Sequence, residues 1–414
     1  MRLRSPFRTA GALAGFLSLA ADVPASGPPE IQKRLEGVVR EFPGTLGVAV
    51  KNLDTGESFA VNGDPRFPTA SLIKVAVMVE VEHRIAEGKL SRETTVTLKE
   101  SDKAGDEPVV LNQLHGGIPL TVSDLLALMI AFSDNTATNL LVGLVGAADV
   151  DRRMVSYGLA NTKIFRPTFR DGHADVFPEE EREFGLGMTT PREIARLMEL
   201  IAEGKVVSRK VCDEMLSMME KQQDRAMIPR SLPFERDRIT VANKTGWDEE
   251  KLPDAKGFKG DVRTDAAFVK SPKARYVIAI CARRVRDKSP GADNKALVTG
   301  AAISRMIYDH FNRDVTPAGS PSVASTPPPP SVPIVEGESV EAAAVVAADN
   351  EQDGIAFENE WIYRHYGRFR RRSGGVASLA GRRYDVIKVE LSDHTERTLY
   401  FDITDFFGRE KPRK

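Results

Sequence analysis

The sequence predicts an α+β domain built around one antiparallel sheet, followed by a small β-rich module. Strand-like runs lie near both ends of the first 313 residues, and helical periodicity fills most of the interval between them. Strands that are distant in sequence must then pair, so we expect the terminal helices on one face of the sheet and a helical subdomain on the other. A proline-rich stretch, followed by renewed aromatic and β-branched runs, predicts the separate module.

Composition is that of an ordinary soluble chain of two or three domains. Of the 414 residues, 41% are hydrophobic and 28% are charged. The formal net charge of -1 provides no overall attraction to nucleic acid, so we expect no such partner. We expect a monomer.

The N-terminus has the pattern of a secretory signal. Residues 1–8 are basic, and the apolar run that follows at residues 9–21 is too short to span a bilayer. Val23-Pro24-Ala25 offers small residues for cleavage, so residues 1–25 are predicted to be a signal peptide. This predicts a periplasmic or secreted protein, and a disordered basic tail is the alternative.

The first elements after the signal are a helix and a hairpin. Residues 31–42 carry apolar side chains at helical spacing, and Gly44 ends that helix. Residues 46–50 and 58–61 are short strands joined by the turn signal Asp54-Thr55-Gly56. A buried helix is expected directly after this hairpin, beginning near Pro68.

Helical patterns then dominate as far as about residue 204, and strands return after it. The predicted helices include residues 122–132, 137–145 and 191–202, whereas residues 161–187 show no periodicity. Strands are predicted at residues 239–244, 265–269 and 276–283, and an amphipathic helix at residues 295–311. These elements complete a domain spanning residues 31–313.

The last hundred residues divide into a linker and a module. Residues 315–353 are rich in proline and alanine and predict a disordered linker. Residues 354–414 are predicted to form a β-rich module of unknown function. Its basic run at residues 368–372 could contact an anionic cell envelope, and a solvated arginine loop is the plainer alternative. The two cysteines, Cys212 and Cys281, are expected to be separate buried thiols.

Ser71 and Lys74 form the first candidate catalytic pair. Residues three apart on a helix share a face, so the amine of Lys74 can reach the hydroxyl of Ser71. A serine needs such a base to become a nucleophile, and N–H groups at a helix start can face an oxyanion. Taken alone, the pair also fits a capping serine followed by a solvated lysine.

Two further motifs follow in order. Ser133-Asp134-Asn135 comes after an apolar helical run, and Lys244-Thr245-Gly246 ends a strand-like run. The set S-x-x-K, S-D-N and K-T-G resembles the class A β-lactamases and penicillin-binding proteins. The resemblance covers about residues 31–312 and implies the β-lactamase/transpeptidase-like fold, with a five-stranded antiparallel sheet between helical layers and an all-helical subdomain.

The resemblance also implies a role for each motif residue. Ser71 would form a covalent acyl-enzyme, Lys74 would help to move its proton, and Ser133 would pass a proton to the leaving nitrogen. Lys244 would provide a catalytic positive charge. The substrate would be held by Asn135, Thr245 and Gly246, and the oxyanion hole would be formed by the backbone N–H groups of Ser71 and Trp247.

The sequence departs from the family pattern beside the K-T-G motif. Trp247 stands where small residues are usual, and its indole is expected to crowd the mouth of the cleft. Arg263 matches a position where some members place a carboxylate-binding arginine, and an exposed strand-edge arginine is the alternative. The connection between Gly246 and Arg263 is long and charged, so we expect it to overhang the cleft and to influence substrate choice.

A second departure concerns release of the acyl group. Efficient class A enzymes carry an E-x-x-L-N segment whose glutamate activates the hydrolytic water, and residues 161–187 contain no such segment. Asp171 and Glu179 are the candidate bases that we name, among several acids of the interval. His173 is a weaker candidate.

The sequence therefore predicts an exported serine hydrolase that acts on β-lactams through an acyl-enzyme, and the missing segment favours slow release of the acyl group. A peptidase acting on D-Ala-D-Ala cell-wall peptides has the same acylation machinery. A penicillin-recognising protein that acylates without turnover is a third reading, from a different class. No pairing of histidine with Cys, Asp or Glu at ligand spacing predicts a metal, and no cofactor is expected.

Overall fold

The computed structural model describes residues 29–105, 109–169, 177–234, 237–313, 343–346, 351–367, 369–379, 382–391 and 395–404. The chain divides into two compact units, Met1–Val315 and Thr316–Lys414. Each unit has a hydrophobic core of its own. None of the helices in the described ranges is long and apolar enough to cross a membrane.

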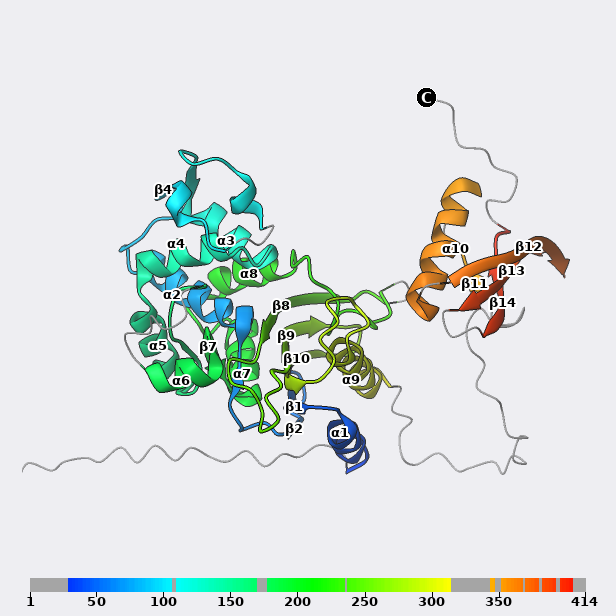
Figure 1. Cartoon of the computed structure of the whole chain (residues 1–414), viewed down its shortest axis with the longest axis horizontal. Helices are drawn as coiled ribbons and strands as arrows, with labels where there is room; N and C mark the ends of the chain where they lie inside the picture. The colour runs from blue at the N-terminus through cyan, green and yellow to red at the C-terminus, as the bar shows by residue number, and fades with distance from the viewer. Residues whose placement is uncertain are drawn as a thin grey trace, which may run out of the picture. The chain divides into compact units, whose positions relative to one another are not determined.

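The first unit is built on a five-stranded antiparallel sheet with the order β2-β1-β10-β9-β8 (Figure 1). Its strands are β1 (Thr45–Asn52), β2 (Ser58–Val61), β8 (Thr240–Glu249), β9 (Asp261–Lys270) and β10 (Arg275–Val285). The N-terminal hairpin thus joins the sheet through β1, which pairs with β10 from the far end of the domain, with Thr45 opposite Arg283. This confirms the predicted fold class.

Both faces of the sheet are covered because its central strands are apolar on both sides. Successive side chains of a strand point to opposite faces, so Val48 and Ile280 join one core while Ala49 and Ala279 join the other. Helices α1 (Pro29–Glu41) and α9 (Lys295–Asn312) pack on the first face. The remaining helices of the unit form a subdomain on the second (Figure 1).

Helix α2 (Lys74–Ala86) is the central element of this subdomain. Its residues from Lys74 to Glu82 are all buried, which is the pattern of a helix enclosed on every side. The helices around it are α3 (Val122–Ala131), α4 (Asn135–Val145), α5 (Ala147–Ser156), α6 (Pro178–Phe184), α7 (Pro191–Ala202) and α8 (Arg209–Met219). Capping side chains start four of them, namely Thr121, Asp134, Thr190 and Ser208.

The short elements of this unit lie between the helices. They are β3 (Phe67–Pro68), β4 (Thr95–Thr97), β5 (Pro119–Thr121), β6 (Lys163–Ile164) and β7 (Gly187–Thr189), with 3-10 turns at Ala70–Ile73, Glu100–Asp102 and Val110–Gln113. Strands β6 and β7 pair with each other, and β7 also pairs with β3. The aperiodic interval at residues 161–187 therefore contains α6 and two short strands, and its residues 170–176 lie outside the described ranges.

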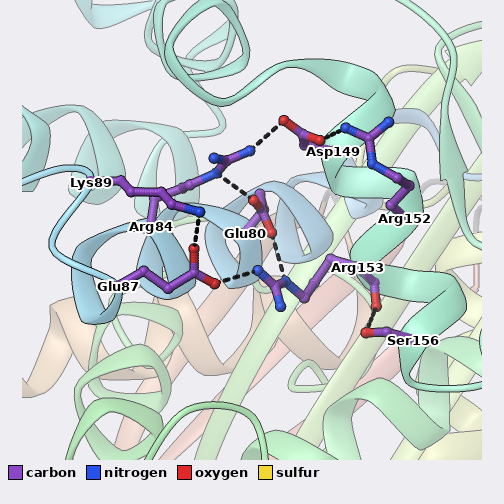
Figure 2. Close-up of a pocket in the computed structure, with 8 residues that line it drawn as sticks. All are labelled: Glu80, Arg84, Glu87, Lys89, Asp149, Arg152, Arg153 and Ser156. Atoms are coloured by element: carbon purple, nitrogen blue, oxygen red, sulfur yellow. Dashed lines mark hydrogen bonds and ion pairs between the residues drawn. The ribbon is translucent and has the colours of Figure 1, made fainter.

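An ion-pair cluster joins α2 to α5 around a cavity of about 410 Å³ (Figure 2). Glu80 is only 1% exposed, and its carboxylate accepts hydrogen bonds from Arg84 Nε at 2.7 Å and Arg153 Nε at 2.8 Å. The cavity is lined by Glu80, Arg84, Glu87, Lys89, Asp149, Arg152, Arg153 and Ser156. Its charged groups are paired with one another, so we interpret the cluster as structural support for the helix that carries Lys74.

The C-terminal unit is a four-stranded sheet with one helix on it. The strand order is β11-β14-β13-β12, and only β11 and β14 are parallel. The elements are β11 (Ala344–Val345), α10 (Glu351–Tyr366), β12 (Phe369–Leu379), β13 (Arg382–Leu391) and β14 (Glu396–Asp402). Ile362 of α10 packs on Ile387, Val389, Leu399 and Phe401. The predicted β-rich module is thus present as a separate unit.

Two details of this unit differ from the sequence prediction. Strand β11 and the start of α10 lie within residues 315–353, which were expected to be linker. Ala344 and Val346 are buried against the sheet, so apolar contacts order a segment whose composition resembles a linker. The basic run lies on β12 rather than in a loop, and within it Arg371 pairs with Glu358 and Asp385. Arg368 lies outside the described residues.

Both thiols are free and fully buried, as expected. Cys212 is on α8 and Cys281 is on β10. Burial raises the pKa of the Cys281 thiol, which makes it unreactive.

Candidate active site

Ser71 lies on a 3-10 turn that leads directly into α2. The turn spans Ala70–Ile73, and the α-helix begins at Lys74, so the sequence prediction of one continuous helix was wrong at this point. Ala70 has a positive φ of 46°, an uncommon backbone conformation for a residue with a Cβ. The turn leaves Ser71 half-buried, while Lys74 is completely buried.

Ser133 is hydrogen-bonded to both buried lysines of the motifs. Lys74 Nζ donates to Ser133 Oγ at 3.2 Å and Lys244 Nζ donates to the same oxygen at 3.0 Å. Lys74 Nζ also donates to the carbonyl oxygen of Ser133 at 2.6 Å and to Asn135 Oδ1 at 2.7 Å. The structure thus brings together the three motifs, which lie far apart in the sequence.

The turn between α3 and α4 positions Ser133 for these contacts. Ser133 has a φ of 57°, the left-handed conformation that ends one helix sharply before the next begins. Asp134 then caps α4 by accepting from the N–H of Ala137 at 2.9 Å, and it also accepts from the N–H of Leu111 at 2.8 Å. The buried aspartate of the motif therefore has a structural role, while its two neighbours face the lysines.

Burial weakens the proton affinity of the second lysine. Lys244 is fully buried, and desolvation lowers the pKa of its ammonium to about 8, although Asp224 and Asp265 partly offset the effect. Its Nζ also donates to the carbonyl oxygen of Thr245 at 2.9 Å. A lysine in this state carries a charge near neutral pH and loses it within the ordinary working range.

Asp265 lies next to this motif, and sequence reasoning did not identify it. It is opposite Thr245 in the pairing of β8 with β9, and burial raises the pKa of its carboxyl to about 7. The carboxyl accepts from Asn243 Nδ2 at 3.0 Å and from the N–H of Ile228 at 3.0 Å. A polar residue within an apolar strand was the signal that could have identified it.

Gly246 allows the edge strand to approach the serine turn closely. Strand β8 is an edge of the sheet, so the backbone groups on its outer side have no strand partner. A Cβ on Gly246 would lie 2.4 Å from the carbonyl oxygen of Thr69 and 2.9 Å from the nitrogen of Leu72. Only glycine fits here, and the contact brings the backbone at Trp247 towards the backbone at Ser71, as an oxyanion hole requires.

Arg263 lies beneath the indole of Trp247. The two residues are opposite each other in the strand pairing, and the guanidinium carbon lies 4.7 Å from the ring centroid. Arg263 is only 6% exposed, so the alternative of an exposed strand-edge arginine was wrong. Its Nε donates to Asp261 Oδ2 at 2.8 Å, and Trp247 Nε1 donates to Asp261 Oδ1 at 2.9 Å. Trp247 itself is 58% exposed.

Thr168 is the loop residue that the structure places against the S-D-N motif. Its Oγ1 donates to the carbonyl oxygen of Asn135 at 3.3 Å and to Asn139 Oδ1 at 2.9 Å. The Asn139 side chain also accepts from the N–H of Thr168 at 2.7 Å and donates to its carbonyl oxygen at 3.2 Å. Asn139 is one helical turn after Asn135, so its position on the same helix face could have indicated this anchor.

Of the two named deacylation candidates, the structure describes only Glu179. Glu179 lies on the first turn of α6 with 83% of its side chain exposed, and its ion pair is with Arg182 at 3.9 Å. A base that activates water in the cleft would have to be at hydrogen-bond distance from that water, so this surface position does not fit the role. Asp171 and His173 lie outside the described residues. Nearby Glu181 is buried and forms an ion pair with Arg166, with 2.7 Å between Glu181 Oε1 and Arg166 Nε.

The assembled site has the parts that acyl transfer requires. Ser71 is the nucleophile candidate, the hydrogen bond between Lys74 and Ser133 could carry a proton, and the edge of β8 has backbone N–H groups and a buried lysine. Among the residues that the structure describes, no group of three or more His, Cys, Asp or Glu side chains could hold a metal ion.

Comparison with known proteins supports the same assignment. Residues 30–311 match the family model described as the beta-lactamase enzyme family. A β-lactamase of Bacteroides uniformis is 26% identical over 308 residues, which cover 71% of this chain and 95% of the relative.

Two solved structures are similar in sequence and in fold. The β-lactamase from Sphaerobacter thermophilus is 28% identical with a TM-score of 0.57, covering 68% of this chain and 96% of that one. A mutant of PBP-A, solved as an acyl-enzyme complex with penicillin G, is 29% identical with a TM-score of 0.57, covering 70% and 98%. The three motifs, the sheet order and the family match agree, and the chain belongs to the beta-lactamase enzyme family.

Proposed function

We propose that this protein is an exported serine hydrolase that opens β-lactam rings through a covalent acyl-enzyme and releases the product slowly. The observation that carries the proposal is the position of Ser133 Oγ, which accepts hydrogen bonds from two fully buried lysines. Such a hydroxyl can pass a proton to a leaving nitrogen, because its own hydrogen is left free to donate. The family membership supports the same substrate class.

In the proposed acylation, Ser71 Oγ attacks the lactam carbonyl carbon. The C–N bond of the ring breaks and an ester to Ser71 forms. The proton of the Ser71 hydroxyl leaves through Lys74, and Ser133 delivers a proton to the nitrogen of the opened ring. The negative charge that develops on the carbonyl oxygen is stabilised by the backbone N–H groups of Ser71 and Trp247.

We infer slow release from Thr168, the described loop residue that contacts the S-D-N motif. Hydrolysis of the ester needs a base that removes a proton from water, and the buried loop residue beside Asn135 is Thr168, which is not a base at neutral pH. Among the described residues of the site, Lys74 is the remaining candidate base beside Ser133 and Asn135. Its Nζ is engaged with Ser133 and Asn135, which is a geometry suited to acylation.

Intact-protein mass spectrometry with benzylpenicillin tests the proposal directly. We expect an adduct of the mass of the whole drug to form within the first time points and to persist long after free drug is removed. An adduct that disappears within a single turnover would show that an efficient base is present. No adduct at any concentration or time would overturn the proposed function.

A peptidase acting on D-Ala-D-Ala peptides is the second candidate. The same observation favours it, because the described loop residue beside Asn135 is a threonine and not an acid. Both functions use the acylation step, but only the peptidase turns over a peptide. Release of D-alanine from a short acyl-D-Ala-D-Ala peptide, measured beside hydrolysis of a chromogenic cephalosporin, separates the two. A lasting adduct with no turnover of either substrate would favour the third reading, a penicillin-recognising protein.

The pKa of Lys244 predicts the pH dependence of acylation. Its ammonium is proposed to bind the substrate carboxylate, and with a pKa of about 8 that charge is present below pH 8 and is lost above it. We expect kcat/KM for a carboxylated cephalosporin to fall roughly 10- to 100-fold as the pH rises through 8, the scale of a charged hydrogen bond. The methyl ester of the same compound is the control and should show a smaller fall. A flat profile from pH 7 to pH 9 would contradict the assignment.

Export and envelope contact are proposals that rest on the sequence. Residues 1–25 carry the pattern of a cleaved signal, which N-terminal sequencing of the protein from a periplasmic or culture fraction would test. An uncleaved chain in the cytoplasmic fraction would refute it.

For the C-terminal module, Arg371 and Arg372 already pair with carboxylates of their own unit, whereas Arg370 and Lys388 are exposed cations that an envelope polymer could meet.

A further inference from the structure

A cluster of three side chains lies beside the part of β8 that is proposed to form the oxyanion hole. It consists of Trp247, Arg263 and Asp261. Asp261 is 3% exposed and accepts from both the Arg263 guanidinium and the Trp247 indole. Arg263 Nη2 also donates to the carbonyl oxygen of Ser289 at 3.3 Å, and Asn294 Nδ2 donates to Asp261 Oδ2 at 3.3 Å. The charge of the arginine is therefore matched by a buried carboxylate, and its face is covered by an aromatic ring.

The position of this cluster relates it to substrate recognition. Thr245 and Trp247 are two residues apart on β8, so their side chains point to the same face of the strand, with Cα atoms roughly 7 Å apart. A carboxylate held by Thr245 and Lys244 would lie beside the indole. The exposed part of the ring, 58% of the residue, is the surface that such a substrate meets, whereas Arg263 is 6% exposed.

We infer that Asp261 and Trp247 withhold Arg263 from the substrate, so that Lys244 and Thr245 alone bind the carboxylate and Trp247 selects substrates with a flat apolar group next to it. Arg263 is then a positioning residue for the indole. This inference rests on the proposed acylation of β-lactams. It differs from the role that the family resemblance implies for an arginine at this position.

A comparison of charged and neutral substrates tests the first half. The readout is the ratio of acylation rates for a cephalosporin and its methyl ester. We expect Arg263→Gln, whose amide can still donate to Asp261, to leave the ratio within about 2-fold, because no direct charged hydrogen bond is lost. Trp247→Ala uncovers the arginine and should raise the ratio roughly 10-fold, the lower end for gaining such a bond. Adding Arg263→Gln to Trp247→Ala should remove that gain.

A second substrate pair tests the aromatic wall. Two cephalosporins that differ only in the group next to the carboxylate, a methyl or a phenyl-bearing substituent, should be acylated at rates roughly 2- to 10-fold apart in favour of the ring, the scale of one aromatic pair. Trp247→Ala should abolish this preference. Leu252→Ala, which removes another exposed apolar side chain of the same connection, is the matched control and should retain it.

The outcomes separate this inference from the proposed function. A fall of about 10-fold or more in the charge ratio for Arg263→Gln would show that Arg263 binds the carboxylate directly. An unchanged ratio in Trp247→Ala would show that the indole does not cover Arg263. An unchanged preference for the phenyl substituent in the same variant would show that the indole does not select it. In each case acylation of Ser71 itself would persist. Complete absence of acylation would overturn the proposed function and this inference with it.

Discussion

Replacing Ser71 with alanine is expected to abolish covalent labelling by any β-lactam. Ser71 is the motif serine that is half-buried on the 3-10 turn before α2, three residues before a fully buried lysine, and close to the edge of β8. The other motif hydroxyl, Ser133, accepts from both lysines and is therefore placed to move a proton rather than to attack. Intact-protein mass spectrometry after incubation with benzylpenicillin measures the result.

Ser91→Ala provides the control, since Ser91 is an exposed serine before β4 and belongs to none of the three motifs. That variant should be labelled as fast as the parent protein. A circular dichroism spectrum and a thermal melt of Ser71→Ala would establish that the variant is folded, because its half-buried side chain leaves no large cavity. Labelling of the folded Ser71→Ala variant at the parent rate would remove Ser71 from the mechanism.

Introducing a carboxylate at position 168 is expected to accelerate release of the acyl group by about 100-fold or more, the usual contribution of a positioned general base. Thr168 is anchored on both backbone groups by Asn139 and touches the backbone of Asn135, whose side chain contacts Lys74. The side chain of Thr168→Glu would therefore start beside Asn135, the residue that Lys74 contacts. In the parent protein, a chromogenic cephalosporin should give a burst of one product per enzyme followed by slow turnover. In the variant, steady turnover should replace the burst.

Thr168→Gln is the matched control, because it has the size of glutamate and no basic oxygen. It should retain the burst and the slow phase. Rapid linear turnover in the parent protein would contradict the prediction, and would mean that another residue, such as an acid of the interval 170–176, already activates water. Slow release in Thr168→Glu equal to that of Thr168→Gln would show that the side chain does not reach the hydrolytic water.

Much of the fold could be predicted because its signals are local. The hairpin of β1 and β2 follows from two short apolar runs around a turn signal, and α3, α4, α7 and α9 follow from apolar spacing and caps. The prediction failed at the module boundary. There Ala344 and Val346 are ordered by contacts with a sheet that is formed some fifty residues later, and composition does not report such contacts.

Some residues of the candidate site could likewise be predicted from local motifs, and others could not. Three short motifs in order identified Ser71, Lys74, Ser133, Asn135 and Lys244, because catalysis fixes both the residue types and their local spacing. Thr168 and Asn139 were missed, since their contact joins a loop to a helix across 29 positions and neither residue belongs to a known pattern.

The sequence by itself therefore determined the family and the order of the elements, and it singled out the candidate residues for acylation. Only the tertiary structure decided the environment of these groups. It buries Lys244 and so lowers the pKa of that ammonium to about 8. It pairs Arg263 with Asp261 under the ring of Trp247, and it places Thr168 beside Asn135. The physical reason is that desolvation and charge pairing depend on which distant segments are brought within a few ångströms, and a sequence pattern carries no such distances.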